Sequence, residues 1–188
     1  MMRVISGKAR SLRLKTLEGM DTRPTQDRIK ETLFNMVQHD VAGKDFLDLF
    51  AGSGAIGIEA LSRGCRQAVF VENHKKAAAC IRENLIHTKL TGDAQVLVTD
   101  VLSALRKLEA EGRTFDFIFM DPPYNKGMEG SVLRELDHSS VCGGQTLVIV
   151  ESSLQTEFED GMFDHLKIVK VKQYKTNKHT FLQKMQED

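Results

Sequence analysis

Residues 46–61 most constrain what this chain can fold into. The run of residues 46–50 is apolar except for Asp48, and it stops at a glycine-rich segment, residues 52–57, after which helical spacing begins. A short buried strand, a glycine turn and a helix N-terminus together form a device that holds nucleotides. The glycines have the spacing G-x-G-x-x-G, which alone does not identify the ligand.

The same succession of strand and helix continues along the chain. Apolar runs predict strands at 68–72, 95–100, 115–120 and 145–151, and helical spacing predicts helices at 55–63, 74–90, 101–110 and 128–136. This alternation predicts a doubly wound α/β fold, a Rossmann-like and mostly parallel sheet covered on both faces. Two final runs, 167–175 and 179–185, predict a hairpin that completes seven strands with an antiparallel edge. In helix 101–110 we expect Leu102, Leu105 and Leu108 to face the core.

The N-terminal residues read as an extension of this core. Residues 2–16 predict two short strands around a bend near Gly7, and residues 25–39 predict a helix with Thr25 as its N-cap. A length of 188 residues suits one domain. We therefore expect a single domain, residues 1–188, with a basic extension over 1–40 and a catalytic core over 41–188.

Composition indicates an ordinary reduced globular protein. Cys65, Cys80 and Cys142 are far apart, so we expect buried, unpaired thiols. The six histidines show no metal-ligand spacing, and we predict no metal site. No segment has the apolar length of a signal peptide or a membrane span, which predicts a cytoplasmic protein with no membrane contact.

A formal net charge of zero hides an uneven distribution. Residues 1–30 carry eight Lys/Arg against three acids, and residues 165–186 carry six lysines and no acid. Two basic ends on an acidic middle suggest that the termini contact a polyanion, although solvated surfaces remain the alternative for either end.

Acidic residues follow several of the predicted strands. Because parallel strands end at one edge of a sheet, Gly52, Glu72, Asp100 and Asp121 should meet in one crevice. Glu72 lies twenty positions after Gly52, where an acid accepts hydrogen bonds from two ribose hydroxyls. Asp100, with the backbone of Val101, lies where an adenine amine is read, and Asp100 is also a possible N-cap for the next helix.

The segment Asp121-Pro122-Pro123-Tyr124 decides between NAD and S-adenosylmethionine. Proline restricts the residue before it and its own φ, so the carboxylate of Asp121 and the carbonyl of Pro122 are held as two acceptors. Together they can accept both hydrogens of a planar exocyclic amine and keep electron density on its nitrogen. Tyr124 offers a ring on which the base stacks, worth on the order of 1–3 kcal/mol. The combination indicates methyl transfer to an amine.

These motifs resemble the class I S-adenosylmethionine-dependent methyltransferases, and the whole chain resembles the RsmD family of small-subunit ribosomal RNA guanine-N2 methyltransferases. The resemblance rests on the following segments in order: Arg3-Val-Ile-Ser-Gly7, Thr22-Arg-Pro-Thr-Gln-Asp-Arg28, Leu33-Phe-Asn35, Asp48-Leu-Phe-Ala-Gly-Ser-Gly54 and Glu59-Ala-Leu-Ser-Arg-Gly64. One departure is the C-terminal hairpin, where Tyr174 is followed by Lys175-Thr-Asn-Lys-His-Thr180 instead of the family's Tyr-Gly-x-Thr. No site residue is assigned there.

The resemblance implies S-adenosylmethionine as cofactor and an assembling or assembled small ribosomal subunit as partner of a monomeric enzyme. It implies catalytic residues Asp121, Pro122, Pro123 and Tyr124, and cofactor-binding residues Asp48, Ala51, Gly52, Ser53, Gly54, Glu72, Asn73, Asp100 and Val101. Asp48 would face the cofactor's ammonium group, or alternatively cap the glycine loop. The basic extension would grip RNA phosphates through Arg3, Lys8, Arg10, Arg13, Arg23, Thr25 and Arg28, and the target base would flip into the crevice.

Three rival functions remain at this point. A DNA adenine-N6 methyltransferase would use the same four-residue segment, but the chain has no obvious separate target-recognition domain. An NAD-dependent oxidoreductase would use the glycine spacing and would leave residues 121–124 unexplained. A non-catalytic RNA-binding module would bind RNA without transferring a methyl group.

Overall fold

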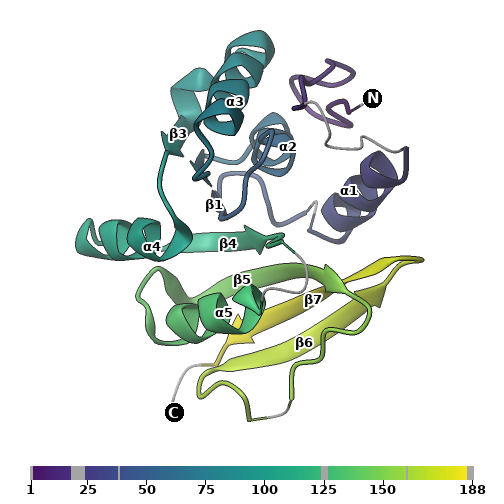
Figure 1. The fold of residues 1–188 in the computed structure, drawn as a ribbon. Helices are drawn as coiled ribbons and strands as arrows, with labels where there is room; N and C mark the ends of the chain where they lie inside the picture. The colour runs from purple at the N-terminus through teal and green to yellow at the C-terminus, as the bar shows by residue number, and fades with distance from the viewer. Residues whose placement is uncertain (1, 18–23, 38, 124–126, 160, 186–188) are drawn as a thin grey trace.

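The computed structural model describes residues 2–17, 24–37, 39–123, 127–159 and 161–185, with side chains described from Asp27 onward in the first helix (Figure 1). Within these residues the chain forms one seven-stranded sheet with the order β3-β2-β1-β4-β5-β7-β6. Its strands are β1 (Asp45–Asp48), β2 (Gln67–Val71), β3 (Ala94–Leu97), β4 (Phe115–Met120), β5 (Cys142–Ser153), β6 (Leu166–Gln173) and β7 (Asn177–Lys184).

The sheet has a parallel part and an antiparallel edge. Strands β1 to β5 pair in parallel, and β7 pairs antiparallel with both β5 and β6. Figure 1 shows the β6–β7 hairpin extending the sheet beyond β5. The predicted fold class, a Rossmann-like sheet with an antiparallel C-terminal hairpin, is confirmed.

Five α-helices cover the two faces of the sheet among the described residues. They are α1 (Pro24–Val37), α2 (Ala55–Ser62), α3 (Lys75–Thr88), α4 (Val101–Ala110) and α5 (Met128–His138), and a single 3-10 turn (Thr91–Asp93) precedes β3. One core cluster joins α1, α2 and α3 to sheet residues such as Phe46 and Phe70, and a second joins α4 and α5 to Leu47 and Ile118. Since successive strand residues point to opposite faces, the continuous apolar strands serve both clusters.

Helix α4 corrects one expected core position. Leu105 and Leu108 are buried as predicted, but Leu102 is 37% exposed. The buried stripe begins with Val101 and Ala104, which precede Leu105 and Leu108 at helical spacing. Leu102 lies about 100° around the helix from Val101, so it turns away from the sheet.

The N-terminal segment is a tight loop instead of the two predicted strands. Its one strand-like pairing is an isolated antiparallel bridge between Arg3 and Arg13. Some backbone groups between these residues pair within the segment, and others bind α2: Lys8 N donates to Ser62 O (2.8 Å), and Ser62 Oγ donates to Ser6 O (2.6 Å). A Cβ on Gly7, whose φ is +83°, would lie 1.8 Å from Ser62 O. The bend at Gly7 is therefore packed directly onto α2.

The three cysteines are buried and unpaired, as predicted. Burial raises the pKa of the Cys65 thiol to about 12 and that of Cys142 to about 11, which keeps both protonated. Among the described residues, no helix has the length and apolarity needed to span a bilayer.

Candidate active site

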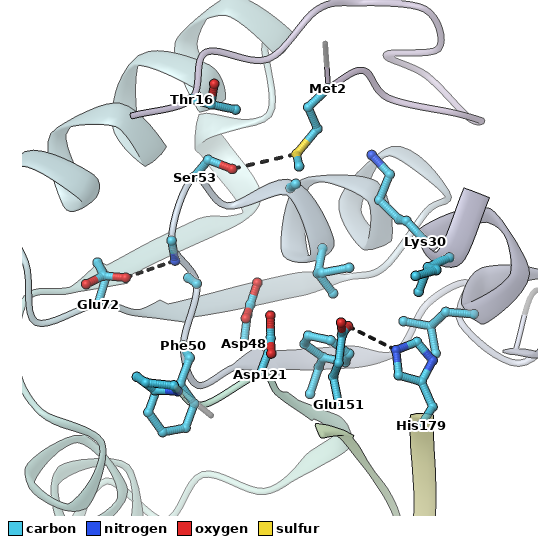
Figure 2. Close-up of a pocket in the computed structure, with 18 of the residues that line it drawn as sticks. Met2, Thr16, Lys30, Asp48, Phe50, Ser53, Glu72, Asp121, Glu151 and His179 are labelled. Carbon is cyan, nitrogen blue, oxygen red and sulfur yellow. Dashed lines mark hydrogen bonds and ion pairs between the residues drawn. The ribbon is translucent and has the colours of Figure 1, made fainter. Parts of the chain in front are cut away.

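A cavity of about 580 Å³ opens at the carboxyl edge of the parallel strands, a volume typical of small-ligand sites. Figure 2 shows the side chains that line it. Charged and polar groups come from the ends of neighbouring strands, namely Asp48, Glu72, Asp121, Glu151 and His179. The N-terminal segment and α1 close it from the other side with residues that include Met2, Thr16 and Lys30. Residues distant in sequence thus converge on one crevice, as the strand-end pattern predicted.

The glycine loop is held by Glu72. Gly52 N donates to Glu72 Oε2 (2.9 Å) and His74 N donates to Glu72 Oε1 (2.8 Å). These bonds orient the carboxylate at the cavity wall, and each oxygen keeps a further lone pair for a ligand hydroxyl. Gly52 and Gly54 adopt left-handed φ values of +55° and +81°, which glycine adopts without strain.

Asp48 is a buried acid with one oxygen left over. It is 1% exposed, and its Oδ2 accepts from Gly57 N (3.1 Å). Its Oδ1 is among the few buried side-chain atoms of the described chain that have no hydrogen-bond partner. Burial, with a contribution from the charge of Glu72, raises the pKa of Asp48 to about 7. An unpaired buried carboxylate oxygen at the cavity wall fits the cationic ammonium of S-adenosylmethionine, while Oδ2 caps the loop. The two predicted roles of Asp48, facing the ammonium group and capping the glycine loop, are therefore compatible with each other.

A second, smaller hollow of about 60 Å³ adjoins the cavity and shares Glu72 and Asn73 with it. Asp100 and Val101 lie in its lining beside Leu49 and Phe50, which follow β1, and Val71 of β2. Asp100 Oδ1 accepts from Ser103 N (2.9 Å), and this bond lowers the pKa of Asp100. Asp100 is thus the N-cap of α4 and also a wall of the hollow.

The remaining predicted cofactor residues, 51–54, lie in the glycine loop that follows β1. Ala51, Gly52 and Ser53 line the cavity, whereas Gly54 is absent from its lining. Gly54 is the left-handed residue that precedes α2, and its neighbouring Ser53 carbonyl accepts from Asn84 Nδ2 (2.9 Å).

Asp121 follows β4 and is exposed into the cavity although protein surrounds it. This burial among protein atoms and the negative charges of Glu151, Asp48 and Glu129 together raise the pKa of Asp121 well above its usual range. Pro122 is buried and Pro123 is exposed, with Pro123 in the cavity lining. Tyr124 lies outside the described residues. A cationic ligand bound near Asp121 would favour the ionised form of its carboxyl group.

Several polar residues of the cavity lining were missed from the sequence, among them Glu151 and His179. Glu151 and His179 line the cavity beside Asp121, and their facing atoms, Oε2 and Nε2, are 3.1 Å apart. The signal for Glu151 was available, because it ends the predicted strand 145–151 as the other acids end theirs. No sequence signal identified His179, since the hairpin departs from the family pattern and its pairing with β5 is a tertiary contact.

Five of the predicted RNA-contacting residues have described, exposed side chains on the N-terminal segment and α1. These are Arg3, Lys8, Arg10, Arg13 and Arg28. Arg23 lies outside the described residues, as does the side chain of Thr25 within α1. Their contact with RNA stays a prediction.

One cluster outside the crevice has the composition of a metal site. Ligand atoms of Asp137, His138 and Asp164 lie within 4.8 Å of one another. However, the Asp137 carboxylate accepts from the backbone nitrogens of residues 164–166, at 2.6 to 2.9 Å, and so anchors the start of β6. The expectation of no metal stays a prediction.

Comparison with known proteins identifies the family. The family model described as "Conserved hypothetical protein 95" matches residues 2–183. The Ribosomal RNA small subunit methyltransferase D of Escherichia coli K12 is 32% identical over 154 residues, which cover 82% of this chain and 76% of that protein. The chain belongs to the RsmD family. The predicted family is thus confirmed.

Two further relatives agree with this assignment to the RsmD family. YlbH of Bacillus subtilis 168, described as a candidate rRNA methyltransferase, is 38% identical over 163 residues, which cover 87% of this chain and 89% of YlbH. The solved structure of yhhF from Escherichia coli, described as a candidate methyltransferase, is 28% identical, covers 99% of both chains and superposes with a TM-score of 0.84.

Proposed function

We propose that this protein transfers a methyl group from S-adenosylmethionine to the exocyclic N2 amine of a guanine in small-subunit ribosomal RNA. The observation that carries the proposal is the position of Asp121, exposed into the cavity at the end of β4 and followed by two prolines. The substrate class is supported by relatives over 30% identical that are named ribosomal RNA small subunit methyltransferases.

Residues at the ends of β3, β2 and β1 would hold the cofactor. Asp48 Oδ1 would accept from its ammonium group, Glu72 would accept from its ribose hydroxyls, and Asp100 and Val101 would border its adenine. Backbone groups of residues 51–54, and Asn73, would complete the contacts. When bound, S-adenosylmethionine supplies an electrophilic methyl group on a sulfonium centre.

Asp121 and the carbonyl of Pro122 orient the target amine. Two acceptors in fixed positions take both amine hydrogens and aim the nitrogen lone pair at the methyl group, so that positioning supplies much of the rate. The methylated nitrogen is cationic and loses a proton readily, so Asp121 need not be a strong base. Tyr124 stacks on the base.

A base in a helix cannot reach Asp121, so the nucleotide flips into the cavity. Residues 1–40 form the RNA-contacting extension, and its exposed Arg3, Lys8, Arg10, Arg13 and Arg28 hold phosphates around the flipped nucleotide, together with Arg23 and Thr25. Residues 41–188 form the catalytic core of the same domain, which acts as a monomer on an assembling or assembled small subunit.

The test is product analysis on small subunits that lack the modification. Incubation with the protein and labelled S-adenosylmethionine should yield N2-methylguanine, mapped by mass spectrometry of nuclease digests. N6-methyladenine as the product would support the adenine alternative instead. Binding of NADH in place of the methyl donor would support the oxidoreductase, and RNA binding without product would support the non-catalytic module.

A further inference from the structure

Strand β6 lies at the outer edge of the sheet and carries unbalanced positive charge. All but its first residue are exposed, and residues 165–186, which contain the hairpin, include six lysines and no acid. Lys178 and Lys184 each donate to a backbone carbonyl, at 3.4 and 3.3 Å, and so belong to the fold. The other four are exposed and form no ion pair with any residue that the structure describes, namely Lys167, Lys170, Lys172 and Lys175.

A β-bulge places three of these lysines on one face of β6. The register with β7 shifts between Ile168 and Lys170, which leaves the intervening residue without a partner on β7. Because successive strand residues point to opposite faces, an unshifted β6 would separate Lys167 from Lys170 and Lys172. With the shift, the three lysines lie opposite alternate residues of β7, namely Gln183, Phe181 and His179. Residues directly opposite each other share a face, so Lys167, Lys170 and Lys172 form one lysine row.

The lysine row shares its face of the sheet with the cavity. Phe181 packs in the core cluster that contains α1, and His179 lines the cavity. Lys172 lies directly opposite His179, so the row is one strand away from the cavity wall. Figure 2 shows His179 on the side of the cavity away from Met2 and Thr16 of the N-terminal segment. The row and that segment therefore flank the cavity on different sides.

Exposed apolar residues of β6 occupy the other face. Ile168 and Val171, which are 39% and 47% exposed, lie opposite Leu182 and Thr180. Lysines on an edge strand can also discourage pairing with a second sheet. That role needs charge along the edge, but it does not require the lysines to share the face that carries the cavity. The separation of the charged and apolar faces indicates an anionic partner on the cavity side.

The chemistry of the lysine row fits phosphate groups. A lysine ammonium is a compact charge with three donors, and its phosphate contacts position a nucleic acid without reading the base. A nucleotide that flips into the cavity leaves its neighbours outside, on both sides of the opening. We propose that Lys167, Lys170 and Lys172 bind phosphates of the RNA substrate, across the cavity from the N-terminal segment. This inference rests on the proposed function and adds a second RNA-contacting surface to it.

The test removes two charges from the row in the double variant Lys170→Gln/Lys172→Gln. Binding to small ribosomal subunits that lack the modification is measured over a range of salt concentrations. We expect the slope of log affinity against log salt concentration to fall in magnitude by about 1.4–1.8, and the affinity near about 0.1 M salt to fall on the order of 10-fold or more. For methyl transfer, kcat/KM should fall more than kcat, because the lost contacts bind the substrate. Affinity for S-adenosylhomocysteine should be retained, because neither lysine lines the cavity.

The matched control is the double variant Arg106→Gln/Lys107→Gln. Both residues are exposed on α4, which packs in the other core cluster, so this variant removes the same charge from the opposite face of the sheet. Its affinity and salt slope should equal those of the wild-type protein. Val171→Thr changes the apolar face of β6 and should also leave binding unaltered. Unchanged unfolding midpoints in urea establish that the variants are folded.

Three results would overturn the inference. Wild-type affinity and salt slope in Lys170→Gln/Lys172→Gln contradict phosphate contacts by the row, and so does an equal loss in the α4 control. A loss of binding confined to Val171→Thr would show instead that β6 docks on a protein through its apolar face. If the wild-type protein still produces N2-methylguanine on small subunits, only the row is misassigned. A wild-type protein that neither binds nor methylates small subunits would refute the proposed function itself.

Discussion

Lys30 and Glu59 form a buried ion pair beneath the N-terminal segment, with Nζ 3.6 Å from Oε2. Glu59 is fully buried and also accepts from the backbone nitrogens of Ile5 (2.8 Å) and Ser6 (3.0 Å). Lys30 Nζ donates to Arg3 O, so one pair of charges joins α1, α2 and the segment. Burial lowers the pKa of Lys30, and Glu59 and Asp27 oppose that shift. Since Lys30 lines the cavity, this pair connects the N-terminal segment to the site.

Glu59→Gln should destabilise the protein by about 3–5 kcal/mol, because it removes the fully buried carboxylate that pairs with both Lys30 and Arg63. Urea unfolding followed by circular dichroism measures the change. The control is Glu83→Gln, which breaks the exposed pair between Glu83 and Lys15 and should cost at most about 1 kcal/mol. Similar losses for the two variants would show that the buried pair does not anchor the segment.

Gly7→Ala should cost at least about 2 kcal/mol more than Gly43→Ala, because overpacking adds to backbone strain. Both glycines have left-handed φ values, +83° and +76°. A Cβ on Gly7 would lie 1.8 Å from Ser62 O, whereas a Cβ on Gly43 would meet nothing within 4 Å. Equal unfolding free energies of the two variants would contradict the tight packing of the bend on α2.

Cofactor affinity should rise with pH through about 7, where Asp48 loses its proton in the free protein. Below that pH, the ammonium group must displace a proton from the buried carboxyl, and this lowers the affinity. Above it, the carboxylate is already ionised and the affinity levels off. Calorimetric titration with S-adenosylmethionine between pH 5.5 and 8.5 checks the profile, with about a 10-fold loss expected per pH unit well below the pKa. Asp48→Asn should bind more weakly and with a flattened profile; an unaltered profile would place the titrating group elsewhere.

Asp121→Ala should lower methyl transfer to small subunits by at least about 100-fold while cofactor affinity stays within about threefold, because the lost acceptor orients the amine and not the donor. Single-turnover transfer of labelled methyl groups and calorimetry measure the two quantities. Glu72→Ala is the complementary variant, with weakened cofactor binding expected. Sustained turnover in Asp121→Ala would remove this residue from the catalytic assignment.

Arg10→Ala should weaken binding to small subunits and reduce the slope of log affinity against log salt concentration by about one phosphate contact. Arg10 is exposed on the N-terminal segment. Lys107→Ala is the matched control, because Lys107 is exposed on α4, which covers the opposite face of the sheet. Equal salt slopes for the Arg10→Ala and wild-type proteins would argue against phosphate contacts by this segment.

The parallel part of the fold was predictable because its signals are local. Each strand is a short apolar run, each helix has its own spacing, and the acids that end the strands occupy one edge of any parallel sheet. Burial within a helix was less predictable. Leu102 has the composition of a core residue, but the orientation of α4 on the sheet places Val101 and Ala104 inward instead.

The sequence by itself determined the family and the placement of the acids Asp48, Glu72, Asp100 and Asp121 at the carboxyl edge of the sheet, since each acid lies at or beside a predicted strand end. Only the tertiary structure decided how the N-terminal segment is anchored and what the hairpin contributes. Glu59 binds Ile5 across more than fifty residues of chain, and Glu151 meets His179 only because β7 pairs antiparallel with β5. Such contacts depend on strand order and register, which are set by the packing of the whole sheet and leave no local pattern in the chain.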